Sequence, residues 1–366
     1  LQPEFNRRQK DNPTAPFLDI TPAETQKIMN QAMKNSERWR IMSINGKSDE
    51  EIKQSFEVAT KMKIFTWKGE RDTIMKPKDS IIYYKHFLQT GMMAMEPQTG
   101  HVKAWVGGIN YKYFQYDHVG QGARQVGSTF KPFVYATAID RLQKSPCDMI
   151  MDSPFTILKG DNNDKNWTPN NSDGKYRGLV SMKRALANSI NTVSARLIHE
   201  VGAPAVVEMA KNLGVTSNIP NRPAIALGAV EITVEEMVAA FSTFANEGVY
   251  IKPQLISKIE DKNGVVIYQG VEESHDVVNK DVAYSVIKLM EGVTESGTGS
   301  RLRWAASAPS NFLTGVPYNI KGPVAGKTGT SQNNSDGWFI GMVPNLAAGV
   351  WVGNEDRSAH FESTNM

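Results

Sequence analysis

The feature that most constrains the fold is the position of the strand-forming segments, which lie at both ends of the main part of the chain. Near its start, apolar residues on either side of a Pro-Gln-Thr-Gly turn predict a β-hairpin over residues 91–108. Near its end, three short apolar segments predict strands. They cover residues 323–329, 337–343 and 347–352. Helical patterns dominate residues 130–250, so we expect an α+β fold, with an antiparallel sheet flanked by helices plus an all-helical lobe.

Local signals support this division. Residues 180–201 have a helical pattern, and residues 234–246 predict a helix that begins with a capping box formed by Thr233 and Glu236. After this helix, strands are expected at residues 249–260 and 265–268, joined across an Asn-Gly turn that is typical of hairpins.

The first 80 residues differ in composition from the rest of the chain. They hold 15 Lys/Arg and 12 Asp/Glu, and capping patterns after Thr21 and Ser48 predict two helices. We therefore expect a helical, charged linker followed by one domain. The expected division is a linker over residues 1–80, a domain over residues 81–366, and a helical lobe within it at about residues 130–250.

Composition excludes several classes of function. A chain of 366 residues with 40% hydrophobic and 22% charged residues is an ordinary globular protein, and its net charge of +3 is too small for a protein whose main partner is nucleic acid. The single cysteine, Cys147, excludes an internal disulfide, and the scattered histidines give no pattern for zinc or another metal. No segment is long and apolar enough for a membrane helix.

The sequence Ser-x-x-Lys occurs three times, so the pattern alone is weak. Ser172 lies in a polar turn and Ser285 lies inside a helical segment, whereas Ser128 follows a glycine and precedes a helical segment. Ser128 is thus expected at a helix start, where Lys131 reaches its hydroxyl from the same face and acts as its base. Lysine is a base only when neutral, and burial beside a second cation, Lys327, would lower its pKa.

Two further short motifs accompany Ser128. Ser189 and Asn191 form a Ser-x-Asn element that joins two helical stretches, and its polar side chains are expected to project into a cleft. Lys-Thr-Gly occurs once, within Lys327-Thr328-Gly329-Thr330 on a predicted strand. There, glycine lets a substrate backbone approach, the lysine and threonine side chains suit a carboxylate, and a backbone N–H suits an oxyanion.

Together these motifs resemble the signature of penicillin-binding proteins and class A β-lactamases. The segment Arg124 to Phe133 closely resembles the nucleophile segment of class A, bifunctional penicillin-binding proteins, although that family usually has Pro where Val126 stands. Further stretches resemble the same family, so the expected fold is of the penicillin-binding transpeptidase and serine β-lactamase type. These stretches are Ala94 to Gly108, Ala226 to Ala229, Phe244 to Gly248, Gly297 to Gly299 and Asp336 to Gly341.

The resemblance departs from the family pattern in three ways. No segment resembles the glycosyltransferase domain, no membrane anchor is present, and the chain ends at Met366, where the family usually adds a helix. The expectation is therefore a transpeptidase domain with part of the preceding linker. Its location would be the outer, periplasmic face of the bacterial cytoplasmic membrane.

The resemblance implies a D,D-transpeptidase that cross-links peptidoglycan through a serine acyl-enzyme. Its partners would be stem peptides, namely a D-Ala-D-Ala donor and an amine acceptor, together with β-lactam antibiotics, and no cofactor is implied. The implied catalytic residues are Ser128, Lys131, Ser189, Asn191 and Lys327. Thr328, Gly329 and Thr330 would bind substrate, and the backbone N–H groups of Ser128 and Thr330 would form the oxyanion hole.

Two other functions fit the same motifs. A serine β-lactamase shares the acyl-enzyme but needs an efficient way to hydrolyse it, and no segment aligns with the glutamate loop of class A enzymes. Glu200, Glu208 and Glu231 fall in the right interval of the chain. A β-lactam or cell-wall peptide sensor would use the same residues without turnover, and the class A flanking segments count against it.

Overall fold

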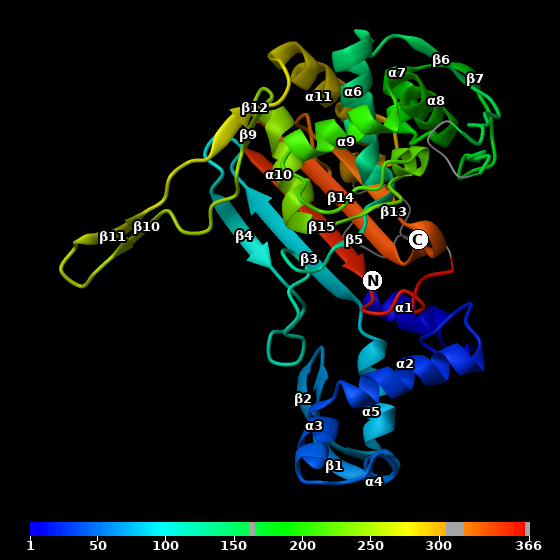
Figure 1. Cartoon of the computed structure of the whole chain (residues 1–366), viewed down its shortest axis with the longest axis vertical. Coiled ribbons are helices and arrows are strands. Elements are labelled where there is room, and N and C mark those ends of the chain that lie inside the picture. Colours follow the sequence, from blue (N-terminus) through cyan, green and yellow to red (C-terminus); the bar gives the residue numbers. More distant parts are fainter. Residues whose placement is uncertain (161–164, 305–317, 363–366) are drawn as a thin grey trace.

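The computed structural model describes residues 1–160, 165–304 and 318–362. Its centre is a five-stranded antiparallel sheet with strand order β13-β14-β15-β3-β4 (Figure 1). The strands are β3 (Gln89–Met95), β4 (Val102–Val106), β13 (Ala325–Thr330), β14 (Asp336–Val343) and β15 (Leu346–Gly353). β15, near the C-terminal end of the chain, pairs with β3, which precedes the helical lobe. Strands from before and after the lobe thus form one sheet, which confirms the α+β prediction.

Side-chain alternation fixes the sheet's register. Along β15 buried residues alternate with more accessible ones, and Trp351 pairs with Gly91 while Ala347 pairs with Met95. A shift of one residue would turn the buried set to the opposite face, so this register is strongly specified.

Helices cover the sheet and build the lobe (Figure 1). The largely buried helix α10 (Val234–Ala245) and the buried face of the amphipathic helix α11 (Lys280–Glu295) pack against the sheet strands. The lobe contains α6 (Lys131–Leu142), α7 (Met182–Ala187), α8 (Asn191–Val201) and α9 (Ala203–Asn212). The capping box of Thr233 and Glu236 at the start of α10 is present, as predicted.

The lobe differs in detail from the sequence expectation. It also contains two short strand pairs, and the helical segment expected over residues 180–201 is divided into β7, α7 and α8. The pairs join β5 (Arg124–Gln125) to β8 (Glu231–Ile232) and β6 (Met149–Asp152) to β7 (Gly178–Ser181). Ser189, one of the predicted site residues, lies in the break between α7 and α8.

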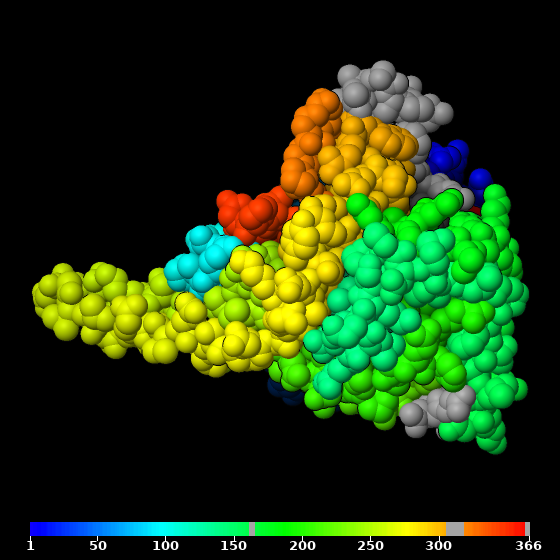
Figure 2. Space-filling model, turned by 90° about the horizontal axis from the view of Figure 1, so that it is seen from above, coloured from blue at the N-terminus to red at the C-terminus, as the bar shows by residue number. Residues whose placement is uncertain are grey.

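A two-stranded ribbon projects from the body beside the sheet (Figures 1 and 2). It is formed by β10 (Lys258–Glu260) and β11 (Val266–Gln269), and Gly264 in its turn has a φ of 84°, as the Asn-Gly signal predicted. The strand expected over residues 249–260 is interrupted, because β9 (Val249–Ile251) pairs with β12 (Ser274–Asp276) instead of continuing into the ribbon.

The N-terminal part is not purely helical. It contains a hairpin of β1 (Thr60–Thr66) and β2 (Gly69–Met75) between its helices, which the charged composition did not indicate. The helices are α1 (Gln2–Arg8), α2 (Pro22–Lys34), α3 (Glu37–Ile44), α4 (Asp49–Ser55) and α5 (Pro77–Lys85). Capping boxes begin α2 and α4, as predicted. Phe5 packs against Phe361, so the first residues contact the end of the sheet-containing part. Within the described ranges, no helix has both the length and the apolar character needed to cross a bilayer.

Candidate active site

Ser128 lies in a short 3-10 turn, η1 (Gly127–Phe130), which leads directly into α6. The N–H of Lys131 donates to the carbonyl of Ser128, so side chains three residues apart leave this turn on the same side. Ser128 is half-buried, whereas Lys131 is fully buried. A half-buried hydroxyl and a buried amine therefore leave the same side of this turn, at a helix start as the sequence predicted.

The amine of Lys131 is held by Ser189 and Asn191. Its Nζ donates to the carbonyl oxygen of Ser189 at 2.6 Å, to Oδ1 of Asn191 at 2.6 Å and to Oγ of Ser189 at 3.1 Å. We expected this amine to reach the Ser128 hydroxyl; among the described residues, its hydrogen bonds go to these three oxygens instead. Two of them are carbonyl oxygens that only accept, so a neutral amine satisfies both and keeps its lone pair for a hydroxyl.

Ser189 has a left-handed backbone conformation, with a φ of 55°. It follows α7 in a Schellman pattern, where its N–H donates to Leu186 and the N–H of Ile190 donates to Ala185. Glycine is usual at this position, and a serine there costs about 1 kcal/mol or more. The conformation turns both oxygens of Ser189 toward Lys131. The hydrogen bonds to Lys131 therefore stabilise this strained backbone conformation.

The second buried lysine, Lys327, comes from β13. Its Nζ donates to Oγ of Ser189 at 3.2 Å and to the carbonyl oxygen of Thr328 at 2.9 Å. The hydroxyl of Ser189 thus lies within hydrogen-bond distance of both amines. It accepts from Lys327, and from Lys131 when that amine is protonated, so its own proton can be donated elsewhere. Three motifs that are far apart in the sequence meet at this one hydroxyl.

Burial sets the protonation of the two lysines. Burial, and after it the charge of Lys327, lowers the pKa of Lys131 well below its ordinary value. Burial lowers the pKa of Lys327 to about 7. Because both causes act on Lys131, it loses its proton first as the pH rises, and a neutral Lys131 then lies beside a charged Lys327. Burial and a second cation are the two causes that the sequence predicts for a lowered pKa of Lys131.

Strand β13 lies directly against the nucleophile turn. A Cβ at Gly127 would lie 2.3 Å from the carbonyl oxygen of Thr330, and a Cβ at Gly329 would lie 2.6 Å from that of Val126. We expected Gly329 to leave room for a substrate backbone; the nucleophile turn fills that space instead. The contact brings the backbones of Ser128 and Thr330 close together, as two donors to one oxyanion require.

The threonines of β13 alternate with its buried positions. Lys327 and Gly329 are buried, whereas Thr328 is half-buried and Thr330 is exposed. The hydroxyl of Thr328 lies 2.5 Å from that of Thr298. The Gly-Thr-Gly segment around Thr298 resembles the family in sequence, but the sequence alone indicates no role for it, because only the fold brings it to β13.

Helix α8 is capped by a residue from a distant loop, which sequence reasoning missed. Its own N-cap has no side-chain hydrogen bond, and Oδ1 of Asn171 accepts instead from the N–H of Asn191 at 2.9 Å and of Thr192 at 3.3 Å. Asn171 in turn donates to Oδ1 of the buried Asp152 at 2.7 Å. This network fixes the helix start that presents Asn191 to Lys131.

Comparison with known proteins assigns the family. Residues 90–360 match the family model described as the penicillin binding protein transpeptidase domain. The chain belongs to this family. Residues 12–88 match a second model, the penicillin-binding protein middle domain.

Relatives of the transpeptidase domain agree in fold. Penicillin-binding protein 1A of Aquifex aeolicus is 35% identical over 274 residues, which cover 74% of this chain and 35% of that protein. The solved structure of penicillin-binding protein 1A from Haemophilus influenzae superposes with a TM-score of 0.67 at 24% identity, over 76% of this chain and 45% of that chain. The solved structure of PonA1 of Mycobacterium tuberculosis in complex with penicillin V has a TM-score of 0.61 at 22% identity, over 91% of this chain and 85% of that chain. The chain spans about a third of the length of the Aquifex relative.

Replacing Asn171 with alanine tests the remote cap. We expect the free energy of unfolding to fall by about 1–2 kcal/mol, because two N–H groups of α8 lose their acceptor. We also expect the rate of acylation by benzylpenicillin to fall about tenfold, since Asn191 loses its support. Denaturant unfolding and acylation kinetics measure the two effects.

The neighbouring Asn170 provides the control for this variant. Asn170 meets Asn191 only through its backbone carbonyl, which accepts from Nδ2 of Asn191 at 2.8 Å. Alanine at position 170 keeps that carbonyl and should leave acylation unchanged. Equal losses in the two variants would show that the cap of Asn171 has no special part in the site.

The pH dependence of acylation follows from the two lysines. The rate with benzylpenicillin should rise with pH as Lys131 becomes neutral, and it should fall as Lys327 loses its charge at a pH of about 7. Replacing Lys327 with methionine should move the rising limb to higher pH, because the cation that helps to lower the pKa of Lys131 is gone. A rising limb that stays in place would contradict the coupling of the two amines.

Proposed function

We propose that this chain is a serine D,D-transpeptidase domain that cross-links peptidoglycan stem peptides. The observation that carries the proposal is the pair of buried lysines that share the hydroxyl of Ser189 beside the nucleophile turn. This arrangement supplies a neutral base, a nearby cation and a hydroxyl that is free to donate. Those are the groups that acyl transfer through a serine needs.

Acylation starts at the hydroxyl of Ser128. Its oxygen attacks the carbonyl carbon of the penultimate D-Ala, and its proton passes to the lone pair of Lys131. The N–H groups of Ser128 and Thr330 stabilise the oxyanion, and each such donor is worth about 3 kcal/mol in other acyl-transfer enzymes. Asn191 holds the substrate amide through its side chain.

Collapse of the intermediate breaks the peptide C–N bond. The hydroxyl of Ser189 donates its proton to the leaving nitrogen, and the protonated Lys131 restores it, so D-Ala leaves as the free amino acid. Its carboxylate is bound by Lys327, Thr328 and Thr330 until release. An amine of a second stem peptide then attacks the ester, forms the cross-link and returns the proton to Ser128.

A β-lactam would undergo the acylation step of this mechanism. Its strained amide acylates Ser128 and its carboxylate occupies the place of the terminal D-Ala carboxylate. PonA1, which shares the fold, is known in complex with penicillin V, and this supports the proposal. The proposed location is the outer face of the bacterial cytoplasmic membrane, because the stem peptides are there.

A β-lactamase activity is not supported by the glutamates that fit its chain interval. Among the described residues, Glu200 pairs with Lys144 at 2.7 Å and Glu208 with Arg141 at 3.2 Å. Glu231 accepts from Arg357 at 2.6 Å. Each carboxylate is thus engaged with a cation outside the lysine cluster, where it is not available to activate water against the ester.

The decisive experiment is the intact mass of the protein after brief incubation with benzylpenicillin, followed over hours. A single stable adduct, absent in the Ser128→Ala variant and present in Ser285→Ala, supports the proposal. Ser285 is the matched control because it begins another Ser-x-x-Lys segment, within α11. An adduct that disappears within seconds would indicate a β-lactamase, and no adduct would show that Ser128 is not an activated nucleophile.

A further inference from the structure

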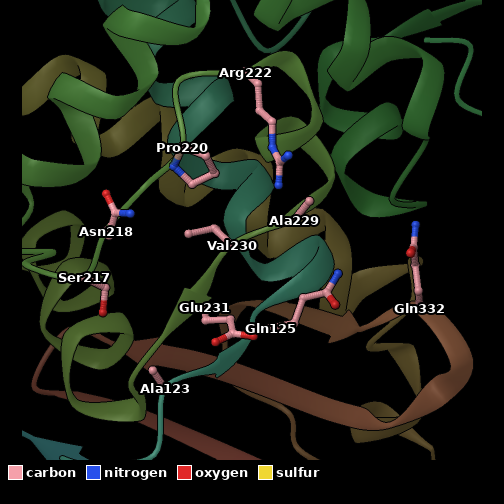
Figure 3. A pocket seen from close by; sticks show the side chains of 10 residues that line it. All are labelled: Ala123, Gln125, Ser217, Asn218, Pro220, Arg222, Ala229, Val230, Glu231 and Gln332. Carbon is pink, nitrogen blue, oxygen red and sulfur yellow. The ribbon is translucent and has the colours of Figure 1, made fainter. Parts of the chain in front are cut away.

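A pocket of about 590 Å³ lies beside the nucleophile segment, and Lys131 and Lys327 are not among the residues that line it. Figure 3 shows the lining residues. Its walls come from three parts of the chain: the strand pair β5 and β8, the loop before η2 (Pro223–Leu227), and the turn after β13. The polar residues that line it include Gln125, Asn218, Arg222, Glu231 and Gln332.

The pocket shares its wall with the active site. The N–H of Val126 donates to Val230 at 3.1 Å, and the N–H of Gly127 donates to Gly228 at 3.2 Å, so the segment that carries Ser128 is fastened to the pocket floor. Gln125 precedes Ser128 by three residues, a span of at most about 11 Å. A peptide attached to Ser128 therefore reaches the pocket within about three residues.

The direction of β13 leads toward the same pocket. The strand runs from Lys327 to Thr330, and Gln332, two residues later, lines the pocket. A donor whose terminal carboxylate lies near Thr328 has its preceding residues directed past Thr330. The pocket is thus on the upstream side of the scissile bond.

Most of the polar side chains that line the pocket lack a hydrogen-bond partner among the described residues. In the part of the chain that the structure describes, the side chains of Gln125, Asn218, Arg222 and Gln332 make no hydrogen bond to another residue. The carboxylate of Glu231 accepts instead from Arg357 at 2.6 Å. Figure 3 shows the guanidinium of Arg222 extending from its loop toward the side of Gln125 and Glu231. Arg222 is therefore the charge in this pocket that no described carboxylate pairs with.

We propose that this pocket is a subsite for a carboxylate of the donor peptide, upstream of the bond that Ser128 attacks, and that Arg222 binds it. A planar guanidinium binds a carboxylate through two parallel hydrogen bonds, and the amides of Gln125 and Gln332 suit the peptide groups around it. The inference rests on the proposed function and adds a specificity to it. Arg222 favours donors with an acidic group at this place over donors with a carboxamide.

The test compares two N-acetylated peptides that end in Lys-D-Ala-D-Ala and differ at one group. In one, the preceding γ-linked D-glutamyl residue carries its free carboxylate, and in the other that group is a carboxamide. The measurement is kcat/KM for release of D-alanine. We expect the wild-type chain to prefer the carboxylate peptide about tenfold, as for a hydrogen bond to a charged group.

The Arg222→Gln variant should lose this preference while its rate with the carboxamide peptide stays within about twofold, and Arg222→Lys should keep part of it. Arg71→Gln, an exposed position on β2, is the matched control and should behave like the wild type. Equal rates with both peptides in the wild type, or equal losses for both in Arg222→Gln, would overturn the subsite. Acylation by benzylpenicillin is measured beside these rates, because its absence would mean failure of the proposed function rather than of the subsite.

Discussion

Replacing Lys131 with methionine is expected to slow acylation of Ser128 by benzylpenicillin about 10³-fold, within the range of general-base contributions. In the proposed mechanism, the variant removes the neutral amine whose lone pair accepts the serine proton, and nothing else in the described site replaces it. The free energy of unfolding should change by less than about 1 kcal/mol. Methionine fills the buried space without an amine to desolvate, which offsets the lost hydrogen bonds to Ser189 and Asn191.

Lys288 provides the matched control for Lys131. It occupies the same place in another Ser-x-x-Lys segment, but it is 39% exposed and pairs with Glu291. Lys288→Met should leave both acylation and the free energy of unfolding close to their wild-type values. Acylation kinetics and denaturant unfolding of both variants check this. If Lys131→Met were acylated at close to the wild-type rate, the base would have to be another group.

The candidate catalytic motifs could be found in the sequence because each one places reactive side chains at a short fixed spacing. Ser128 and Lys131 share one turn, and Lys327 begins the Lys-Thr-Gly-Thr strand, so local geometry is enough to nominate them. The resemblance to penicillin-binding proteins then supplied their roles. The sheet was also predictable, because strand alternation at both ends of the main part survives in β3, β14 and β15.

The supporting residues could not be predicted, because their roles depend on contacts across the chain. Asn171 caps α8 from a loop 20 residues earlier, and no local pattern marks a remote cap. Thr298 meets Thr328 only after α11 packs beside β13. The β1 and β2 hairpin was missed because β2 is largely exposed and polar and lacks the apolar alternation that marks a buried strand.

The glycines of the candidate site have a different structural role from the one that the sequence predicted. Gly329 was expected to admit a substrate, yet its nearest neighbours are the carbonyl of Val126 and the side chain of Thr129. Gly228 likewise leaves room for the backbone of Gly127, since a Cβ there would lie 1.9 Å from its carbonyl oxygen. Glycines thus let the nucleophile turn, β13 and the loop after η2 touch backbone to backbone. In the proposed mechanism, the two oxyanion donors depend on that contact.

Replacing Gly127 with alanine is accordingly expected to damage both stability and function. Its φ of 52° is unfavourable for alanine, and the added Cβ would lie 2.3 Å from the carbonyl oxygen of Thr330, which is backbone and cannot rotate away. Strain and overpacking together should lower the free energy of unfolding by about 3 kcal/mol. Acylation by benzylpenicillin should fall at least about 100-fold, because displacement by about 1 Å separates the two oxyanion donors.

Gly46 separates backbone strain from this contact. Its φ of 74° is also left-handed, but no heavy atom lies within 4 Å of the place its Cβ would take. Gly46→Ala should therefore cost about 1–2 kcal/mol and leave acylation at the wild-type rate per folded molecule. Denaturant unfolding, together with acylation measured on the folded fraction, distinguishes the two variants. If Gly127→Ala lost no more stability than Gly46→Ala and still acylated normally, β13 would have to move freely against the nucleophile turn, and the oxyanion donors would not be preorganised by their contact.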